Sequence, residues 1–162
     1  MATIQDELYQ GLEDTQRGRF LTFALGSEVY GIEIKYVTEI VGLQPISQIP
    51  EVPPYIKGII NLRGRIIPVV DVRLKFKKET AVYTDRTCII VIDTGEVNAG
   101  LIVDNVAEVI GIDDENISPP PELGAGIQNN YLMGIGKVEG NVKLLLNCIK
   151  LFSDEETHAL FA

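Results

Sequence analysis

Two apolar segments joined by a very short polar turn constrain the fold of this chain more than any other feature. The first segment is Ile56–Leu62, the second is Ile66–Val70, and Arg63-Gly64-Arg65 connects them. Strand-forming residues on both sides of a glycine-containing turn predict a tight β-hairpin, in which Gly64 takes the positive φ angle that the turn needs. A hairpin built for stability alone does not need an arginine on each side of its turn. Residues 53–76 are therefore evidence for the fold and also a candidate contact surface.

Length and charge define the class of protein. The chain has 162 residues, of which 46% are hydrophobic and 23% charged, and this fits one globular domain or two small subdomains that share a core. The formal net charge of −9 disfavours binding to nucleic acid or to anionic lipid, because both attract basic surfaces. No apolar run approaches the ~20 residues of a membrane span, and the N-terminus lacks the pattern of a signal peptide. We therefore expect a cytoplasmic protein without direct membrane insertion, and protein partners stay open.

Strand-like segments dominate the rest of the chain. They are rich in Ile, Val, Leu, Phe and Tyr, and Gly, Asp or Asn residues punctuate them. Besides the two segments of the hairpin, the predicted strands are Arg19–Leu25, Val29–Ile32, Cys88–Ile92, Val97–Val103, Tyr131–Val138 and Val142–Asn147.

Helical patterns are few and short. The spacing of Ile34, Val37 and Val41 predicts a short helix over residues 33–41. Ser153, with a glutamate three residues later, forms a capping box that predicts a short helix over residues 153–162. Residues 1–17 are expected to form a flexible N-terminal segment with at most a weak helix.

An internal repeat organises these segments in the order A, B, A′, B′. Unit A is a strand pair followed by the short helix, and unit B is the hairpin. A shift of 69 residues aligns Gly26 with Gly95, Gly31 with Gly100, Val37 with Val106 and Glu39 with Glu108. A shift of 76 residues aligns Tyr55 with Tyr131, Gly58 with Gly134, Gly64 with Gly140, Asp71 with Asn147 and Phe76 with Phe152. Glycines recur because turns and bulges need positive φ angles at fixed places.

Tight turns and few strands per unit favour an all-β fold of two small antiparallel barrels. Barrels of this size are too small to be stable alone, so they are expected to share a hydrophobic interface. The domain is expected to span residues 18–152, in halves of about 18–80 and 86–152. Whether each barrel uses one half or exchanges strands with the other stays open. Residues 113–130, with Pro119-Pro120-Pro121, are expected to form the loop that joins A′ to B′.

Catalytic chemistry is hard to assemble from this sequence. The single histidine, His158, lies near the C-terminus, and neither a phosphate-binding loop nor a calcium-loop spacing is present, so we expect no enzyme activity, cofactor or metal. Asp93-Thr94-Gly95 follows two apolar residues, as in the active-site signature of aspartic proteases. Such an enzyme needs a second carboxylate, which a homodimer would have to supply. A simple turn, with Asp93 and Gly95 as turn formers, explains the same residues.

The two cysteines fit a structural role. Cys88 and Cys148 each lie in an apolar context, with no CxxC spacing and no nearby histidine. This context favours reduced core cysteines of a cytosolic protein, although the sequence leaves a disulfide between them open.

A few charged residues are candidates for partner contact. Glu39 lies with Val37 and Ile40 on a mixed apolar and acidic edge of the predicted helix, and Arg63 and Arg65 flank the hairpin turn. Arginine offers a planar fork of donors to carboxylates or carbonyls, and recognition residues often lie at the tips of rigid hairpins. A solvated charge on a turn or a helix face is the simpler explanation of each residue.

Several motifs together resemble the CheW-like domain family of bacterial chemotaxis. They are Lys57-Gly58-Ile59-Ile60-Asn61-Leu62-Arg63-Gly64, Pro68-Val69-Val70-Asp71, Tyr30-Gly31-Ile32, Val37-Thr38-Glu39-Ile40 and Val103-Asp104-Asn105-Val106. The resemblance runs from about Arg19 to Phe152. The chain starts at Met1 and contains no kinase or receiver segment, so the resemblance favours a stand-alone adaptor. The regulatory module of the histidine kinase CheA, or part of CheV, is the alternative.

The resemblance implies both a fold and a function. It implies two SH3-like, five-stranded β-barrels side by side, and a non-catalytic adaptor that couples the cytoplasmic tips of chemoreceptors to CheA in membrane-associated arrays. Glu122 and Leu123 match a loop that contacts the kinase or takes part in ring packing, although the surrounding sequence departs in detail from the family. The residues that match the receptor-binding positions of the family are Val37, Glu39, Ile40 and Arg63.

Overall fold

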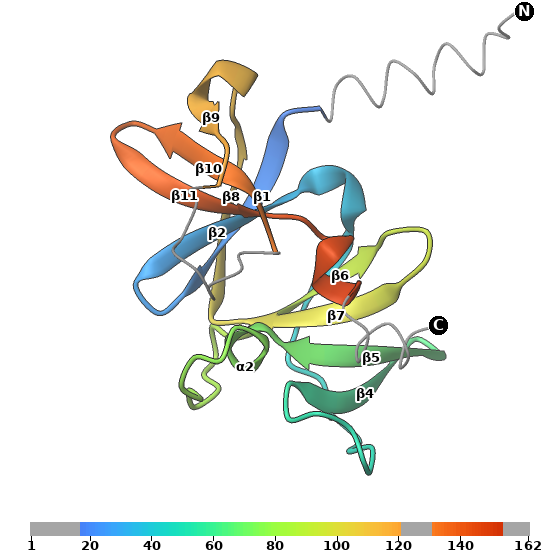
Figure 1. Cartoon of the computed structure of the whole chain (residues 1–162). Coiled ribbons are helices and arrows are strands. Elements are labelled where there is room, and N and C mark those ends of the chain that lie inside the picture. Colours follow the sequence, from blue (N-terminus) through green and yellow to red (C-terminus); the bar gives the residue numbers. More distant parts are fainter. Residues whose placement is uncertain (1–16, 121–130, 154–162) are drawn as a thin grey trace, which may run out of the picture.

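Two curved β-sheets form the protein in a computed structural model, which describes residues 17–120 and 131–153 (Figure 1). The strand order is β8-β1-β2-β11-β10-β9 in the first sheet and β3-β6-β7-β5-β4 in the second. The first sheet lies at the upper left of Figure 1 and the second at the lower right. We call them the first and second barrel. The prediction of an all-β fold with two small barrels is confirmed.

The strands are short, and few helical turns interrupt them. The first barrel contains β1 (Arg19–Leu25), β2 (Glu28–Glu33), β8 (Asn105–Gly111), β9 (Ile117–Ser118), β10 (Leu132–Val138) and β11 (Asn141–Leu146). The second contains β3 (Val37–Gly42), β4 (Ile56–Leu62), β5 (Arg65–Asp71), β6 (Cys88–Asp93) and β7 (Asn98–Val103). The helical turns are η1 (Ile34–Tyr36), α2 (Val72–Lys75), η2 (Asp114–Asn116) and η3 (Lys150–Phe152). The sixth strand of the first barrel, β9, has a counterpart in the second barrel, where Ser47 makes a single bridge to Ile59.

Each barrel takes strands from both halves of the chain. β2 pairs in parallel with β11, and β5 pairs in parallel with β7. The two pairings correspond in the repeat, because Gly31 lies opposite Leu145 as Gly100 lies opposite Val69. In the same way β3 crosses over to complete the second barrel, and β8 crosses back to the first. The repeat therefore produces two similar barrels by exchange, a point that the sequence left open.

The helix predicted over residues 33–41 is wrong beyond its first turn. Only η1 is helical there, and the residues after it form β3, which pairs antiparallel to β6. Four of the six residues of β3 are β-branched, and such side chains pack well on a pleated sheet. The apolar spacing was misleading because alternate burial along β3 also half-buries Val37 and Val41. The contact edge expected on a helix is therefore on a strand. Strand β8, helix α2 and the turn η3 were not predicted, and the loop predicted over residues 113–130 begins with η2 and the short strand β9.

The β4–β5 hairpin matches its prediction. Only Arg63 and Gly64 lie between the two strands, and their φ angles are 52° and 87°. Two consecutive positive φ angles are typical of a type I′ turn, which suits the twist of a hairpin. The equivalent turn between β10 and β11, at Glu139 and Gly140, has φ angles of 51° and 80°. The turn conformation is therefore a property of the repeat and not of the arginine.

The main core lies between the barrels. Its buried members include Phe23 and Ile32 from the first barrel and Ile92 and Leu101 from the second. Smaller apolar clusters lie within each barrel. The shared hydrophobic interface expected for two small barrels is present, and burial of this apolar surface is the main source of their stability.

An ion pair ties the barrels together at one end of their junction. Asp104 lies between β7 and β8, where the chain crosses from the second barrel to the first. Its carboxylate accepts hydrogen bonds from Arg73 Nε and from the backbone N–H of Gly26, both at 2.7 Å, and a second guanidinium nitrogen of Arg73 also donates to it. The hydrogen bonds and charge of Arg73 lower the pKa of the Asp104 carboxyl, and the Gly26 N–H adds to this effect.

We expect Asp104→Asn to lower the free energy of unfolding at neutral pH by about 1–2 kcal/mol, because a partly exposed, charge-assisted pair is lost. The pKa of Asp104 is lower in the folded state than its ordinary value of 3.8. The stabilisation is therefore complete above that value and is lost as the pH falls through the folded pKa. Denaturant titrations at several pH values measure the difference between wild type and variant. Asp85→Asn, at an exposed position, is the control. A difference that persists undiminished in strong acid contradicts this prediction.

Both cysteines are free in the structure. Cys148 is buried, and burial, with a smaller contribution from the charge of Glu33, raises the pKa of its thiol to about 12. Cys88 is half-buried at the start of β6.

We expect a thiol reagent such as a disulfide dye to modify Cys88 first. Because the thiolate is the reactive form and Cys148 is both buried and protonated, Cys148 should react about 100-fold more slowly, and only through opening of the fold. The time course of absorbance after mixing measures both rates. Cys88→Ser should remove the fast phase, and a fast phase that survives in this variant contradicts the assignment.

Two predicted features lie mostly outside the described residues. The structure describes only one residue of the N-terminal segment over 1–17 and only one residue of the C-terminal helix predicted over 153–162. In the second case this residue is Ser153, which is the C-cap of η3. Within the described ranges, no helix is long and apolar enough to cross a membrane.

Candidate functional site

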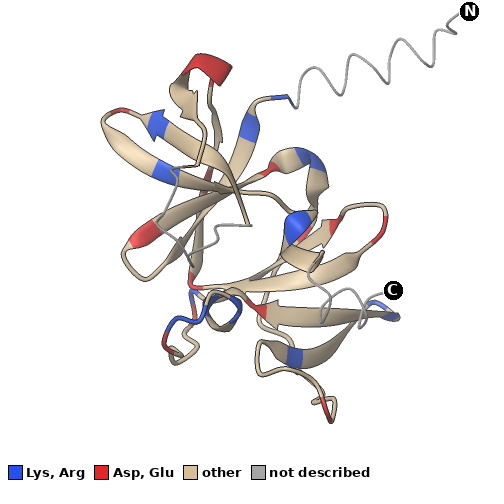
Figure 2. Ribbon diagram, viewed as in Figure 1, with Lys and Arg blue, Asp and Glu red and all other residues tan. Residues whose placement is uncertain are grey.

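Two of the residues singled out in the sequence meet in space. Glu39 comes from β3 and Arg63 from the tip of the β4–β5 hairpin, and Arg63 Nη2 donates to Glu39 Oε1 at 2.6 Å. Arg63 is 69% exposed and Glu39 30% exposed, so the pair lies at the surface of the second barrel. Figure 2 shows the basic residues of this hairpin tip in blue at the right of the molecule. An exposed pair of this kind contributes little to stability, which leaves both side chains available to a partner.

The hairpin turn holds Arg63 in place. The side-chain oxygen of Asn61 accepts a hydrogen bond of 2.8 Å from the backbone N–H of Gly64, and this bond stabilises the turn. The positive φ of Arg63 is uncommon for a residue with a side chain. Because Glu139 adopts the same φ in the other hairpin, the backbone conformation does not require arginine. The two hairpin turns share their backbone conformation and differ in the charge at the tip.

The second arginine of the hairpin has a different partner. The side-chain amide of Asn98, at the start of β7, satisfies both of its neighbours when its oxygen faces Arg65 and its nitrogen faces Ile92. In that orientation it accepts a hydrogen bond from Arg65 and donates one of 3.1 Å to the carbonyl oxygen of Ile92. Arg65 is therefore tied to the neighbouring strand of its own barrel, while Arg63 reaches β3. The turn pattern alone did not separate the two arginines, because both flank the same turn, whereas the family resemblance named only Arg63.

The remaining receptor-site candidates lie in different environments. Burial alternates along β3, so that Val37, Glu39 and Val41 are half-buried while Ile40 is 43% exposed. Val37 packs against the main core at the barrel junction. The structure thus brings Glu39 and Arg63 together, while Ile40, next to Glu39 in the chain, is an exposed apolar residue. Glu122 and Leu123 lie outside the described residues.

The aspartic-protease alternative finds no support in the geometry of Asp93. This residue ends β6, is exposed, and accepts a hydrogen bond of 2.8 Å from the backbone N–H of Gly95. Thr94 and Val97 close the same turn through Thr94 Oγ1. The interpretation as turn formers is confirmed. In the part of the chain that the structure describes, no group of histidine, cysteine and carboxylate side chains could hold a metal ion.

Comparison with known proteins decides the family. The family model described as "CheW-like domain" matches residues 19–156. The chain belongs to the CheW family. Chemotaxis protein CheW of Klebsiella aerogenes is 38% identical over 143 residues, which cover 88% of this chain and 86% of that protein. Chemotaxis protein CheW of Treponema pallidum is 34% identical over 146 residues, with the same two coverages.

A solved structure of the CheW family has the same fold. The scaffolding protein TtCheW from Thermoanaerobacter tengcongensis matches with a TM-score of 0.79 and 37% sequence identity, over 86% of this chain and 94% of its own. This match, together with the family model, places the chain among the chemotaxis adaptor proteins of the CheW family. The resemblance inferred from its motifs is confirmed.

Proposed function

We propose that this protein couples the cytoplasmic tips of chemoreceptors to the histidine kinase CheA and has no catalytic activity of its own. The observation that carries the proposal is the exposed Glu39–Arg63 pair on a CheW-family scaffold. The pair combines one charge of each sign on a rigid hairpin and strand, where its position is well defined. Both side chains reach solvent, so a partner can bind there without opening the core.

The receptor-binding residues in this proposal are Val37, Glu39, Ile40 and Arg63. A receptor tip is helical, and a helix that binds a groove buries an apolar stripe while its polar flanks fix the register. Ile40 is the exposed apolar anchor, and Val37 supports the strand from the core side. Glu39 and Arg63 recognise charged or polar groups of the receptor, which contributes more to partner choice than to affinity.

The kinase contact uses other surfaces of the same small body. We place Glu122 and Leu123 in it, as contacts to the regulatory domain of CheA or to neighbours in a ring. Each interface is small, on the order of 1,000 Å² or less, and is therefore weak alone. Repeated contacts in a membrane-associated array raise the avidity of a cytoplasmic adaptor without any new contact.

Co-sedimentation tests this function. Purified protein is mixed with CheA, with a receptor fragment assembled on vesicles, and with both, and autophosphorylation of the kinase is followed in parallel. We expect the protein to sediment with the receptor, to retain CheA in the pellet, and to raise kinase activity only in the complete mixture. Absence of binding to both partners contradicts the proposal.

A further inference from the structure

We propose that the segment Arg73–Lys78 sets the orientation of the two barrels relative to each other. It thereby fixes the position of a partner-binding surface on one barrel relative to a partner-binding surface on the other. We call its four contacting residues the α2 bracket: Arg73, Lys75, Phe76 and Lys78. Its consequence for signalling rests on the proposed function, whereas its structural part does not.

The α2 bracket is firmly attached to the second barrel. It follows β5 directly, and Asp71 caps α2 by accepting a hydrogen bond from the backbone N–H of Leu74 at 3.3 Å. The other carboxylate oxygen of Asp71 accepts a hydrogen bond of 2.8 Å from the Tyr83 hydroxyl. Asp71 is buried, so this anchor is protected from solvent. The segment is thus fixed on one barrel before it contacts the other.

Charged members of the α2 bracket reach the first barrel at two places. Arg73 holds Asp104, whose carboxylate also accepts the N–H of Gly26 in the β1–β2 turn. Lys78 Nζ lies 3.5 Å from a carboxylate oxygen of Glu28 at the start of β2. A bidentate guanidinium–carboxylate pair is directional, so it fixes an angle as well as a distance.

Aromatic contacts extend the link from the same segment. The ring of Phe76 lies 5.6 Å from the ring of Tyr30 and 5.6 Å from that of Tyr131, centroid to centroid. Both tyrosines belong to the first barrel. Ring pairs at this separation favour particular mutual orientations beyond simple burial.

Lys75 contacts the residues that precede the β4–β5 hairpin and the β10–β11 hairpin. This lysine is only 7% exposed, and its Nζ lies 4.3 Å from the ring centroid of Tyr55 and 5.4 Å from that of Tyr131. The two tyrosines are equivalent in the repeat: the carbonyl oxygen of each accepts a 2.8 Å hydrogen bond, from Asp71 N and Asn147 N respectively. One cation therefore stabilises both barrels through the faces of equivalent rings.

The other copy of the repeat is anchored differently. Leu151 and Phe152 of η3 occupy the positions of Lys75 and Phe76, and both are buried in the main core. Apolar burial is non-directional and tolerates small rotations. The charged contacts described above come from the α2 copy, which is why we assign the orienting role to this copy.

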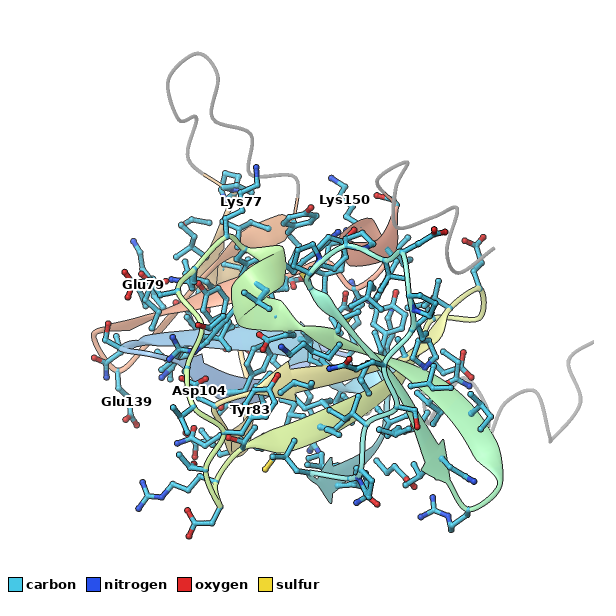
Figure 3. The ribbon with its side chains drawn as sticks, turned by 90° about the horizontal axis from the view of Figure 1, so that it is seen from below. Lys77, Glu79, Tyr83, Asp104, Glu139 and Lys150 are labelled. Atoms are coloured by element: carbon cyan, nitrogen blue, oxygen red, sulfur yellow. The ribbon has the colours of Figure 1, made fainter. Side chains whose placement is uncertain are left out.

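Packing is incomplete at this end of the junction. A pocket of about 310 Å³, open to solvent, lies beside the α2 bracket, between the β1–β2 turn and the segment 81–87. Arg73, Tyr83 and Asp104 all line it, and Figure 3 labels the last two side by side. Where the pocket interrupts close packing, the charged contacts of the α2 bracket supply directional contacts between the barrels.

The structural test compares the alignment of the two barrels in solution. Backbone residual dipolar couplings give one alignment tensor for each barrel, and the two tensors are equal when the barrels form one rigid body. We expect equal tensors in the wild type and in the control Arg86→Gln/Lys150→Met, which changes two exposed residues. Lys150 points away from the barrels (Figure 3). We expect the tensor magnitudes to diverge in Arg73→Gln/Lys75→Met, and equal tensors in this variant overturn the proposal. Should the double variant fail to fold, the milder Asp104→Asn carries the same test.

The functional test separates binary binding from coupling. In Arg73→Gln/Lys75→Met, affinities for the receptor fragment and for CheA, each measured alone, should stay within about 3-fold of wild type. Kinase stimulation in the complete mixture should fall by about 5-fold or more. The receptor-binding and CheA-binding surfaces keep their shape in this variant, but the distance between them is no longer fixed. Unchanged stimulation with diverged tensors overturns the signalling consequence. If the wild type itself fails to couple, the proposed function fails while the tensor comparison still decides the role of the α2 bracket.

Discussion

Gly58→Ala should destabilise the protein by about 3 kcal/mol or more, the largest loss we expect from a single methyl group. Gly58 has a φ of 145°, and a Cβ built on it would overlap the carbonyl oxygen of Ser47 and lie 2.8 Å from the carbonyl carbon. Ser47 cannot move aside, because it exchanges two backbone hydrogen bonds of 2.9 Å with Ile59. The substitution must therefore either strain β4 or break the bridge that takes the place of a sixth strand in the second barrel.

Gly64→Ala is the matched control for this substitution. Gly64 also has a positive φ, of 87°, but no atom lies within 4 Å of the position of its Cβ. Only the backbone penalty remains, and it is about 1 kcal/mol. Urea denaturation followed by far-UV circular dichroism gives both losses. Equal losses in the two variants would mean that close approach to Ser47 is not the cause, and would contradict the prediction.

Arg63→Glu should reduce receptor-dependent stimulation of the kinase by about 10-fold or more, while the fold stays intact. The new carboxylate faces Glu39 and removes the only cation of the pair, so a receptor group that binds the guanidinium meets repulsion. Stability should change by less than about 1 kcal/mol, because the pair is exposed. The repeat itself supports this expectation, since Glu139 already occupies the equivalent turn position with the same φ.

The swapped variant Glu39→Arg/Arg63→Glu separates recognition from local structure. It restores an ion pair between β3 and the hairpin tip but reverses the position of each charge. If the pair served only to hold the hairpin against β3, coupling should return. We expect coupling to stay low, because the receptor binds each charge at its own position. Kinase stimulation measures coupling, and circular dichroism checks the fold. Full activity in the swapped variant, or unfolding of Arg63→Glu, contradicts the role assigned to Arg63.

Local sequence patterns were sufficient to predict most strands and the β4–β5 and β10–β11 hairpins. β1 and β4 begin and end at the predicted residues, because β-branched runs bounded by turn residues determine strand and turn over a few positions. β3 was mistaken for a helix, since its spacing of half-buried residues suits either structure. Its partner, β6, is distant in the chain, and only pairing with it decides the outcome. Non-local pairing is the information that a short window lacks.

The candidate site was predictable one residue at a time but not as an arrangement. Glu39 and Arg63 were identified separately, by the family motifs that contain them. Their ion pair requires the curvature of the second barrel to bring β3 to the tip of the hairpin, and no local pattern encodes that curvature. The same holds for Asp104, which the sequence placed in a motif without any indication that Arg73 and Gly26 would converge on it.

Local sequence is sufficient for the repeat and for the turns of the β4–β5 and β10–β11 hairpins, because a turn depends on the dihedral preferences of two or three consecutive residues. Gly64 and Gly140 supply the second positive φ angle of each turn. Which strands share a barrel depends instead on contacts between distant parts of the chain. The parallel pairing of β2 with β11 and of β5 with β7 joins segments far apart in the chain, and it is selected by burial of the common core. At one end of the junction a pocket interrupts the packing, and charged contacts around α2 cross between the barrels.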